Sequence, residues 1–229
     1  MRILHTADWH VGKTLKGRSR LEEQERVLRE IVQVAREQEV DAVLVAGDLY
    51  DTAAPSAEAQ RLVMRALLGL ARDGAAVVAI AGNHDHARGL EAYRPLAHEA
   101  GITLVGEVRT AEKGGVVELT ARTGEKARLA VLPFLSQRYA VTAADLVTGT
   151  AADHTAEYDR QLRTILDSLT AGFATDAVNL VTAHLTVRDG VFGGGERAAQ
   201  SIFEYHVPAV AFPRDAHYVA LGHLSLIHI

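Results

Sequence analysis

Short apolar runs alternate with segments of helical spacing in the first hundred residues. Residues 2–7, 41–46 and 75–81 are nearly continuous apolar runs, which are typical of buried strands. The segments between them repeat apolar residues every three or four positions, at Leu21, Leu28, Ile31 and Ala35 and then at Leu62, Ala66, Leu67 and Leu70. This βαβαβ order favours a parallel sheet covered by helices on both faces.

The starts of the two helices carry recognisable signals. Ser19 is expected to cap the first helix, with Glu22 and Glu23 near its positive end. Pro55-Ser56 precedes the second helix.

The second half of the chain predicts a further sheet. A short helix is expected near residues 91–100, and segments 115–121 and 126–132 flank T-G-E as a hairpin would. Residues 157–169 have helical spacing, and 177–183 and 218–221 are further apolar strands. No internal repeat or linker interrupts the chain, so we expect one α/β domain.

Composition limits the possible chemistry. The 229 residues are 48% hydrophobic and 23% charged, which is enough to bury a core. The absence of cysteine excludes disulfides and thiolate metal sites and fits a reducing compartment. The apolar runs are too short to cross a bilayer and no signal peptide precedes them, so we expect a cytoplasmic protein without a membrane partner.

Polar side chains follow five of the expected strands. They are Asp8 and His10, Asp48 and Asp51, Asn83, His84 and Asp85, His184, and His223. A single Asp or His at a strand end is more often a cap or turn residue. Because the carboxyl ends of parallel strands meet at one edge, however, the whole set is expected to converge there.

Carboxylate, imidazole and amide groups together suit a centre of two divalent metal ions. Asp48 is the natural bridging carboxylate, and the Asn83 amide coordinates without adding charge. His84 would then act as a proton donor or electrostatic partner, and the chemistry predicted is phosphoester hydrolysis. His5, within its strand, is expected to be a hydrogen-bonded core histidine.

A basic segment follows the first two of these residues. The net charge of −5 argues against a globally basic surface, but K-T-L-K-G-R-S-R at 13–20 gathers four cationic side chains, Lys13, Lys16, Arg18 and Arg20. The segment is either the solvated start of a helix or a phosphate contact, and its place after His10 favours the contact.

The motifs D-W-H, G-D-L-Y-D, G-N-H-D, T-A-H and A-L-G-H-L, in this order, resemble the calcineurin-like metallophosphoesterases, and among them the bacterial DNA nuclease subunits. The resemblance implies a four-layer α+β fold with two mixed β-sheets packed as a sandwich and flanked by helices. It implies that Asp8 and His10 hold one metal, that Asp48 bridges, that Asn83, His184 and His223 hold the other, and that His84 is catalytic.

The same resemblance implies function and partners. These relatives use two Mn²⁺ ions to cleave double-stranded DNA ends and hairpins in DNA repair and recombination. An SMC-like ATPase is the implied protein partner, together with DNA and a homodimer.

One motif departs from this pattern. The family ends the last motif as G-H-x-H, whereas this chain has Ser225 in place of the second histidine. We expect residues 1–224 to form the nuclease domain, residues 225–229 to be a foreign tail, and the DNA-capping and ATPase-docking regions to be absent.

Two alternatives to an active nuclease stay open. In the first, the chain is a fragment that binds DNA ends or dimerises through the helices near Leu62 and Leu90 and hydrolyses nothing. In the second, it is a phosphodiesterase that acts on nucleotides.

Overall fold

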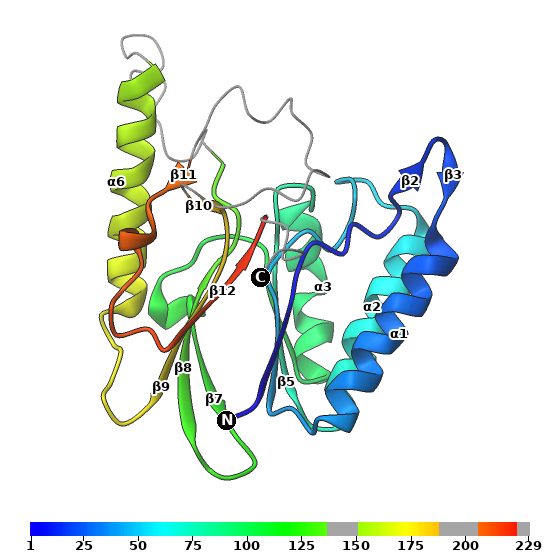
Figure 1. Ribbon diagram of the computed structural model, residues 1–229, viewed down its shortest axis with the longest axis horizontal. Coiled ribbons are helices and arrows are strands. Elements are labelled where there is room, and N and C mark those ends of the chain that lie inside the picture. The colour runs from blue at the N-terminus through cyan, green and yellow to red at the C-terminus, as the bar shows by residue number, and fades with distance from the viewer. Residues whose placement is uncertain (137–150, 188–205, 224–229) are drawn as a thin grey trace.

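Two β-sheets face each other, and helices cover the outer side of each (Figure 1). The computed structural model describes residues 1–136, 151–187 and 206–223. Helix α6 lies on one outer side and helices α1 to α3 lie on the other. The four-layer α/β sandwich predicted from the sequence is therefore confirmed.

The first sheet is built by the N-terminal βαβ units. Its strands run in the order β1-β4-β5-β6, all parallel, with bounds Ile3–Thr6, Ala42–Val45, Ala76–Ile80 and Ile102–Val105. The helices between them are α1 (Leu21–Glu37), α2 (Ala57–Ala71) and α3 (Ala87–Glu99).

The second sheet has the order β12-β9-β8-β7. Its strands are β7 (Val116–Thr120), β8 (Lys126–Leu132), β9 (Val178–His184) and β12 (Tyr218–Gly222), with helix α6 (Ala151–Thr170) outside them. The hairpin partners β7 and β8 are antiparallel, as predicted, while β8, β9 and β12 are parallel.

Short elements complete the described chain. They are β2 (Thr14–Leu15), β3 (Arg18–Ser19), β10 (Thr186–Val187), β11 (His206–Val207) and the 3-10 helices η1 (Ala111–Lys113) and η3 (Ala209–Ala211).

Alternate residues of the strands pack into three apolar layers, one between the sheets and one between each sheet and its helices. In β4, Leu44 points between the sheets, where it joins Leu129 of β8, whereas Val43 and Val45 pack toward α1 and α2. Leu162 and Leu166 of α6 close the outer face of the second sheet. Burial of both faces explains why these strands are apolar at every position.

Two expectations about the sheets need correction. The first sheet is covered by helices on one face only, because its other face packs against the second sheet. Both sheets were expected to be mixed, but only the second sheet is mixed. The first sheet is parallel because each connection between its strands is a crossover, which brings the chain back in the same direction.

Helix starts also differ in detail from the predictions. Ser56 caps α2 as predicted, but the N-cap of α1 is Arg20 and has no side-chain capping bond. Ser19 instead pairs with Thr14 in a small hairpin. Helix α3 begins at Ala87, before the expected residue 91.

Leu62 and Leu90, which marked the helices expected to dimerise, are buried in the core of the chain itself. None of the helices in the described ranges is long and apolar enough to span a membrane.

Replacing Leu129 with alanine should destabilise the fold strongly. Its side chain is completely buried between the sheets, so Leu129→Ala should lower the free energy of unfolding by about 2–5 kcal/mol. Leu15→Ala is the matched control, because Leu15 is 61% exposed and should change stability little. Urea denaturation measures both variants, and equal effects would contradict the assignment of Leu129 to the central layer.

Candidate metal centre

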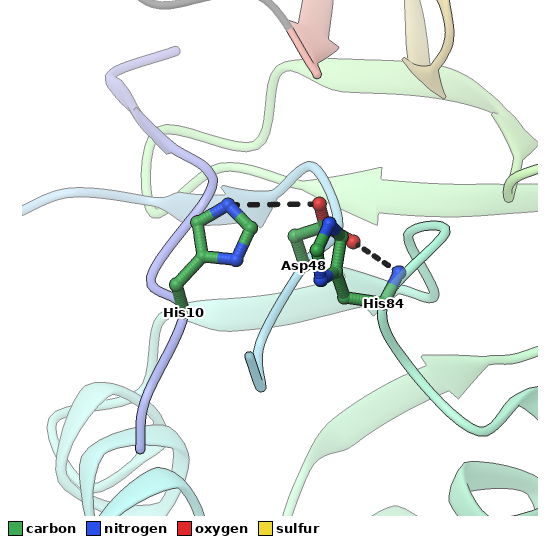
Figure 2. Close-up of side chains that lie close together, drawn as sticks. All are labelled: His10, Asp48 and His84. Carbon is green, nitrogen blue, oxygen red and sulfur yellow. Dashed lines mark hydrogen bonds and ion pairs between the residues drawn. The ribbon is translucent and has the colours of Figure 1, made fainter. Parts of the chain in front are cut away.

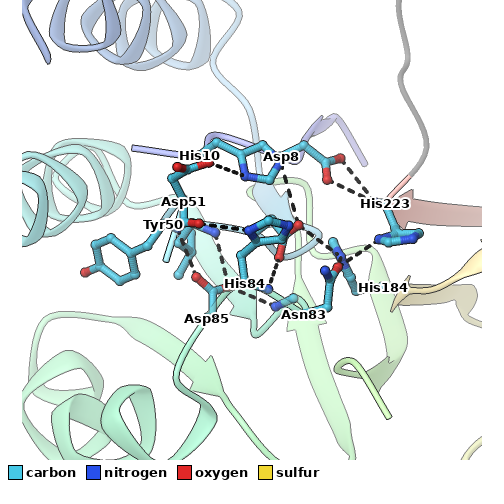
Figure 3. Close-up of polar contacts among 12 residues, drawn as sticks. Asp8, His10, Tyr50, Asp51, Asn83, His84, Asp85, His184 and His223 are labelled. Carbon is cyan, nitrogen blue, oxygen red and sulfur yellow. Dashed lines mark hydrogen bonds and ion pairs between the residues drawn. The ribbon is translucent and has the colours of Figure 1, made fainter. Parts of the chain in front are cut away.

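Side chains from five strand ends meet at one edge of the sandwich (Figure 3). The loop after β1 carries Asp8 and His10, and the loops after β4 and β5 carry Asp48, Asn83 and His84. From the second sheet come His184, the last residue of β9, and His223, which follows β12. The convergence predicted from the sequence is therefore present in the structure.

The first two loops are bound to each other through their backbones. The amide of Asp8 donates to the Gly47 carbonyl at 3.0 Å, and the amide of His10 donates to the Asp48 carbonyl at 3.0 Å. Six non-glycine residues of the described chain have positive φ, and four of them are at this centre: Asp8, His10, Asp48 and His223. Such disfavoured conformations cluster at functional sites because surrounding contacts hold them.

Glycines let the loops approach this closely. A Cβ at Gly47, whose φ is +93°, would overlap Nδ1 of His184, and a Cβ at Gly82 would overlap the Asp48 carboxylate. Both positions therefore need glycine for the centre to form.

Asp48 lies at the middle of the centre and is only 2% exposed. Its Oδ1 accepts a hydrogen bond from the His84 amide at 2.9 Å, and its Oδ2 lies 3.7 Å from Nε2 of His10 (Figure 2). His10, Asp48 and His84 each offer one ligand atom, and these atoms lie within 4.8 Å of one another. They form a first group that could hold a cation.

A second group shares Asp48. It contains His184 and His223, again with ligand atoms within 4.8 Å of one another. Asn83 Oδ1 lies 2.9 Å from Nε2 of His184 and 2.8 Å from Nδ1 of His223, and Asp48 Oδ2 lies 3.5 Å from Nε2 of His184. Asn83 has neither a carboxylate nor an imidazole side chain, but its amide oxygen lies in this group, as predicted.

The hydrogen bonding of His184 indicates that a cation fits the second group. Its Nδ1 donates to the Ala46 carbonyl at 2.8 Å, because a carbonyl can only accept. In the neutral ring, Nε2 then presents a lone pair to the oxygens of Asn83 and Asp48. The Nε2 lone pair and these oxygens repel one another unless a proton or a metal ion lies between them.

The first group also fits a cation. Nε2 of His10 faces Asp48, and the buried Nδ1, 3.7 Å from Oδ1 of Asp51, has no hydrogen-bond partner among the described residues. Burial, opposed by the Asp48 charge, lowers the pKa of His10, which keeps the ring neutral as a metal ligand must be.

Asp48 and His184 shift each other's protonation. Burial alone would raise the pKa of Asp48, but the interaction with His184 and the His84 amide lowers it. Burial alone would lower the pKa of His184, but the Asp48 carboxylate outweighs burial and raises it. In the metal-free chain, the Asp48 carboxylate thus favours a proton on His184 at the place between the acceptors.

Asp8 contacts the second sheet. Its two carboxylate oxygens accept the backbone N–H of His223 at 3.1 and 3.2 Å. This bond joins the loop after β1 to the end of β12, close to the second group.

Asp51 and Asp85, which were expected at this edge of the sheet without an assigned role, support the centre. The Asp51 carbonyl accepts from Nδ1 of His84 at 2.8 Å, which leaves Nε2 of the neutral ring without the hydrogen. The buried Asp85 carboxylate accepts three backbone N–H groups, from Leu49, Tyr50 and Gly82, at 2.8–3.1 Å. Burial raises the pKa of Asp85 despite these bonds. The sequence signals for the two residues were the last letters of G-D-L-Y-D and G-N-H-D.

The residues predicted to contact DNA lie on and next to the small hairpin of β2 and β3, which follows the loop of His10 along the chain. Lys16, Arg18 and Arg20 are exposed and Lys13 is half-buried. Arg20 pairs with Glu23 at 2.8 Å. Ser225 and the expected tail lie outside the described residues. His5 is hydrogen-bonded as predicted, to Tyr218 and the Leu221 carbonyl.

Comparison with protein families agrees with the fold. Residues 1–223 match the calcineurin-like phosphoesterase family model, so the chain belongs to the calcineurin-like phosphoesterase family.

Relatives within this family are nuclease subunits. The chain is 40% identical over 227 residues to the SbcD subunit of the nuclease SbcCD from Bacillus subtilis, covering 98% of this chain and 56% of that one. The equivalent proteins from Rhodobacter capsulatus and Escherichia coli K12 are 37% and 32% identical, over 98% and 100% of this chain and 58% and 57% of theirs. The chain thus spans little more than half the length of these relatives.

The second group should lose metal affinity at a higher pH than the first. His184 binds a cation only when its Nε2 is deprotonated, and its pKa is raised, whereas the pKa of His10 is lowered. As the pH falls from about 8 to about 5, around the ordinary histidine value of about 6.5, the second group should therefore release metal before the first.

Mn²⁺ titrations at several pH values test this order. His10→Ala and His223→Ala assign the two binding events to the two groups. Release of both ions in the same pH window would contradict the opposite shifts of the two histidines.

Proposed function

We propose that this chain is the hydrolytic core of an SbcCD-type nuclease, which cleaves phosphodiester bonds of double-stranded DNA ends and hairpins with two divalent metal ions. The observation that carries the proposal is the sharing of Asp48 by two groups of ligand atoms. The relatives are named as nuclease subunits, which supports a nucleic acid as the substrate class, and DNA is the substrate that the resemblance in the sequence implies.

The proposed ligand assignment keeps His10 and Asp48 of the first group, takes Asp8 from the sequence resemblance in place of His84, and leaves His84 for catalysis. Asp8, His10 and Asp48 would hold the first ion, and Asp48, Asn83, His184 and His223 the second, with Mn²⁺ as the ion. Bound cations would supply charge to activate water and to neutralise the phosphoryl oxygens. The ligand set of oxygen and imidazole nitrogen without thiolate suits Mn²⁺.

His84 would handle protons during hydrolysis. Because the Asp51 carbonyl fixes the hydrogen on Nδ1, the free Nε2 is the atom available to the substrate. The ring packs edge-on against His10 with centroids 4.8 Å apart, so it is held beside the first group. When protonated at Nε2, His84 can donate to the leaving oxygen or balance charge on the phosphate.

DNA would be guided by the basic hairpin. Lys13, Lys16 and Arg18 make no ion pair within the described ranges, and they adjoin the loop of His10. Contacts from these side chains and from Arg20 to phosphates would place the duplex end without reading its sequence.

Protein partners would bind other surfaces. We propose the SMC-like ATPase SbcC as a partner, as the name of the relatives suggests, and a homodimer. On α2 and α3 the side chains exposed for such a dimer are Leu68, Tyr93 and Leu96, at 48%, 37% and 72% exposure.

Replacing Asp48 with alanine should weaken both metal sites together. Removal of the shared carboxylate takes a ligand from each ion, so the affinity for both should fall by about 100-fold or more. Calorimetric titration with Mn²⁺ measures affinity and stoichiometry. Asp73→Ala, which alters an exposed pair with Arg36, should leave both unchanged. Two ions bound normally to Asp48→Ala would rule out the bridge.

Ser225 offers a test of activity. A serine hydroxyl is a poorer ligand than imidazole, so the first ion should bind weakly in the chain as it stands. Ser225→His should tighten that ion and raise Mn²⁺-dependent cleavage of duplex DNA by about tenfold or more. Cleavage is compared at limiting and saturating Mn²⁺, on duplex DNA and on short nucleotides.

Each result of this comparison has a distinct meaning. Equal cleavage by both chains at every Mn²⁺ concentration would show that position 225 holds no metal. Preference for short nucleotides would favour a nucleotide phosphodiesterase, and DNA binding without cleavage by either chain would favour a non-catalytic DNA-binding module.

A further inference from the structure

Helix α1 reaches into the loop of His10 through one side chain. The Gln24 amide donates from Nε2 to the His10 carbonyl at 2.8 Å and accepts the Gly12 N–H on Oε1 at 3.0 Å. Gln24 is half-buried and lies in the first turns of the helix. A single side chain therefore supplies both a donor and an acceptor to this loop.

These bonds complete the fixation of His10. On its amino side, the N–H of His10 donates to the Asp48 carbonyl at 3.0 Å. On its carboxyl side, the carbonyl accepts from Gln24 and from the Lys13 amide. The peptide planes on both sides of the Cα are thus held, which maintains the positive φ of 43° that points the ring toward Asp48.

Relaxation of this loop would move the ring. A non-glycine residue at positive φ is disfavoured and persists only where its surroundings hold it. Loss of the Gln24 bonds would leave the His10 carbonyl with the Lys13 amide as its donor, while the Val11 N–H of the same peptide keeps its bond to the Leu49 carbonyl at 3.0 Å. The imidazole would then spread over more orientations, few of which point toward Asp48.

We infer that Gln24 is a positioning residue that holds His10 in the orientation needed to bind the first metal ion. This inference rests on the proposed metal centre. Gln24 itself touches neither the carboxylates nor the imidazole rings of either group in the contacts described.

The variant that tests this role is Gln24→Met. Methionine has nearly the same length and a similar helix propensity but forms neither hydrogen bond. Gln33→Met is the matched control on the same helix, because the side chain of the exposed Gln33 bonds to Glu37, at 2.6 Å, away from the loop of His10. Thermal denaturation checks that both variants fold.

Two measurements are made on each chain. Amide hydrogen exchange of Gly12 in the metal-free protein reports on the loop without any bound ion. Mn²⁺ titration, extended to millimolar concentrations and assigned with His10→Ala, reports on each metal site separately.

Gln24→Met should affect the first metal site and leave the second unchanged. In Gln24→Met, exchange at Gly12 should accelerate by about tenfold or more, and affinity at the first site should fall by about 10- to 100-fold, as for other outer partners of ligands. The second site should keep its affinity, and Gln33→Met should match the unsubstituted chain.

Other results would overturn the inference. Faster exchange at Gly12 with unchanged first-site affinity would show that the bonds stabilise the loop only. Equal weakening of both sites would show a general loss of structure. If Gln24→Met does not fold, Gln24→Glu keeps the acceptor for Gly12 and loses the donor to His10, and normal first-site affinity there would also refute the role.

Failure of the metal centre is distinguishable from failure of this role. Absence of two bound ions in the unsubstituted chain would refute the proposed function and this inference with it. Two ions in the unsubstituted chain and in Gln24→Met, with equal affinities, would refute the role of Gln24 alone.

Discussion

The hydrogen bond between Nδ1 of His184 and the Ala46 carbonyl joins the two sheets at the edge where their strands end. His184 ends β9 and Ala46 follows β4, so the bond fixes the carboxyl end of one sheet against that of the other. The bond also fixes the tautomer of His184. A carbonyl oxygen can only accept, so the hydrogen of the neutral ring is on Nδ1, and Nε2, without a hydrogen, faces Asp48 and Asn83. One contact thus fixes the orientation of His184 and adds a polar link to the apolar layer that packs the two sheets together.

Hydrogen bonds to backbone amides hold the loops of the centre in place. The carboxylate of Asp85 binds amides on both sides of the centre, Leu49 and Tyr50 on one loop and Gly82 on the next. This fixes the spacing between Asp48 and Asn83 before any ion arrives. A preorganised centre of this kind loses little conformational freedom on binding, which favours affinity.

Apolar periodicity in the sequence was sufficient to predict the five strands whose ends carry the centre and the hairpin of β7 and β8, but the edge strand β6 and the two-residue strands were missed. It could not show which layer covers each face of the first sheet, because Val43 and Leu44 are equally apolar although one faces helices and the other a sheet. Ser19 was misplaced as a cap because its pairing with Thr14 depends on the hairpin turn. Asp85 and Gln24 act on backbone groups brought near only by folding, so no spacing in the sequence reveals their partners.

Charge explains why such a centre can serve an acidic chain. The protein has a net charge of −5, which repels a polyanion at long range. At the centre, Asp85 is compensated by three amides, and imidazole and amide groups would bind the proposed ions without adding negative charge. The carboxylates of Asp8 and Asp48 then carry less negative charge than two bound dications carry positive charge. With the proposed ions in place, the edge of the sandwich becomes locally positive, and the neighbouring lysines of the hairpin extend that field toward a phosphate backbone.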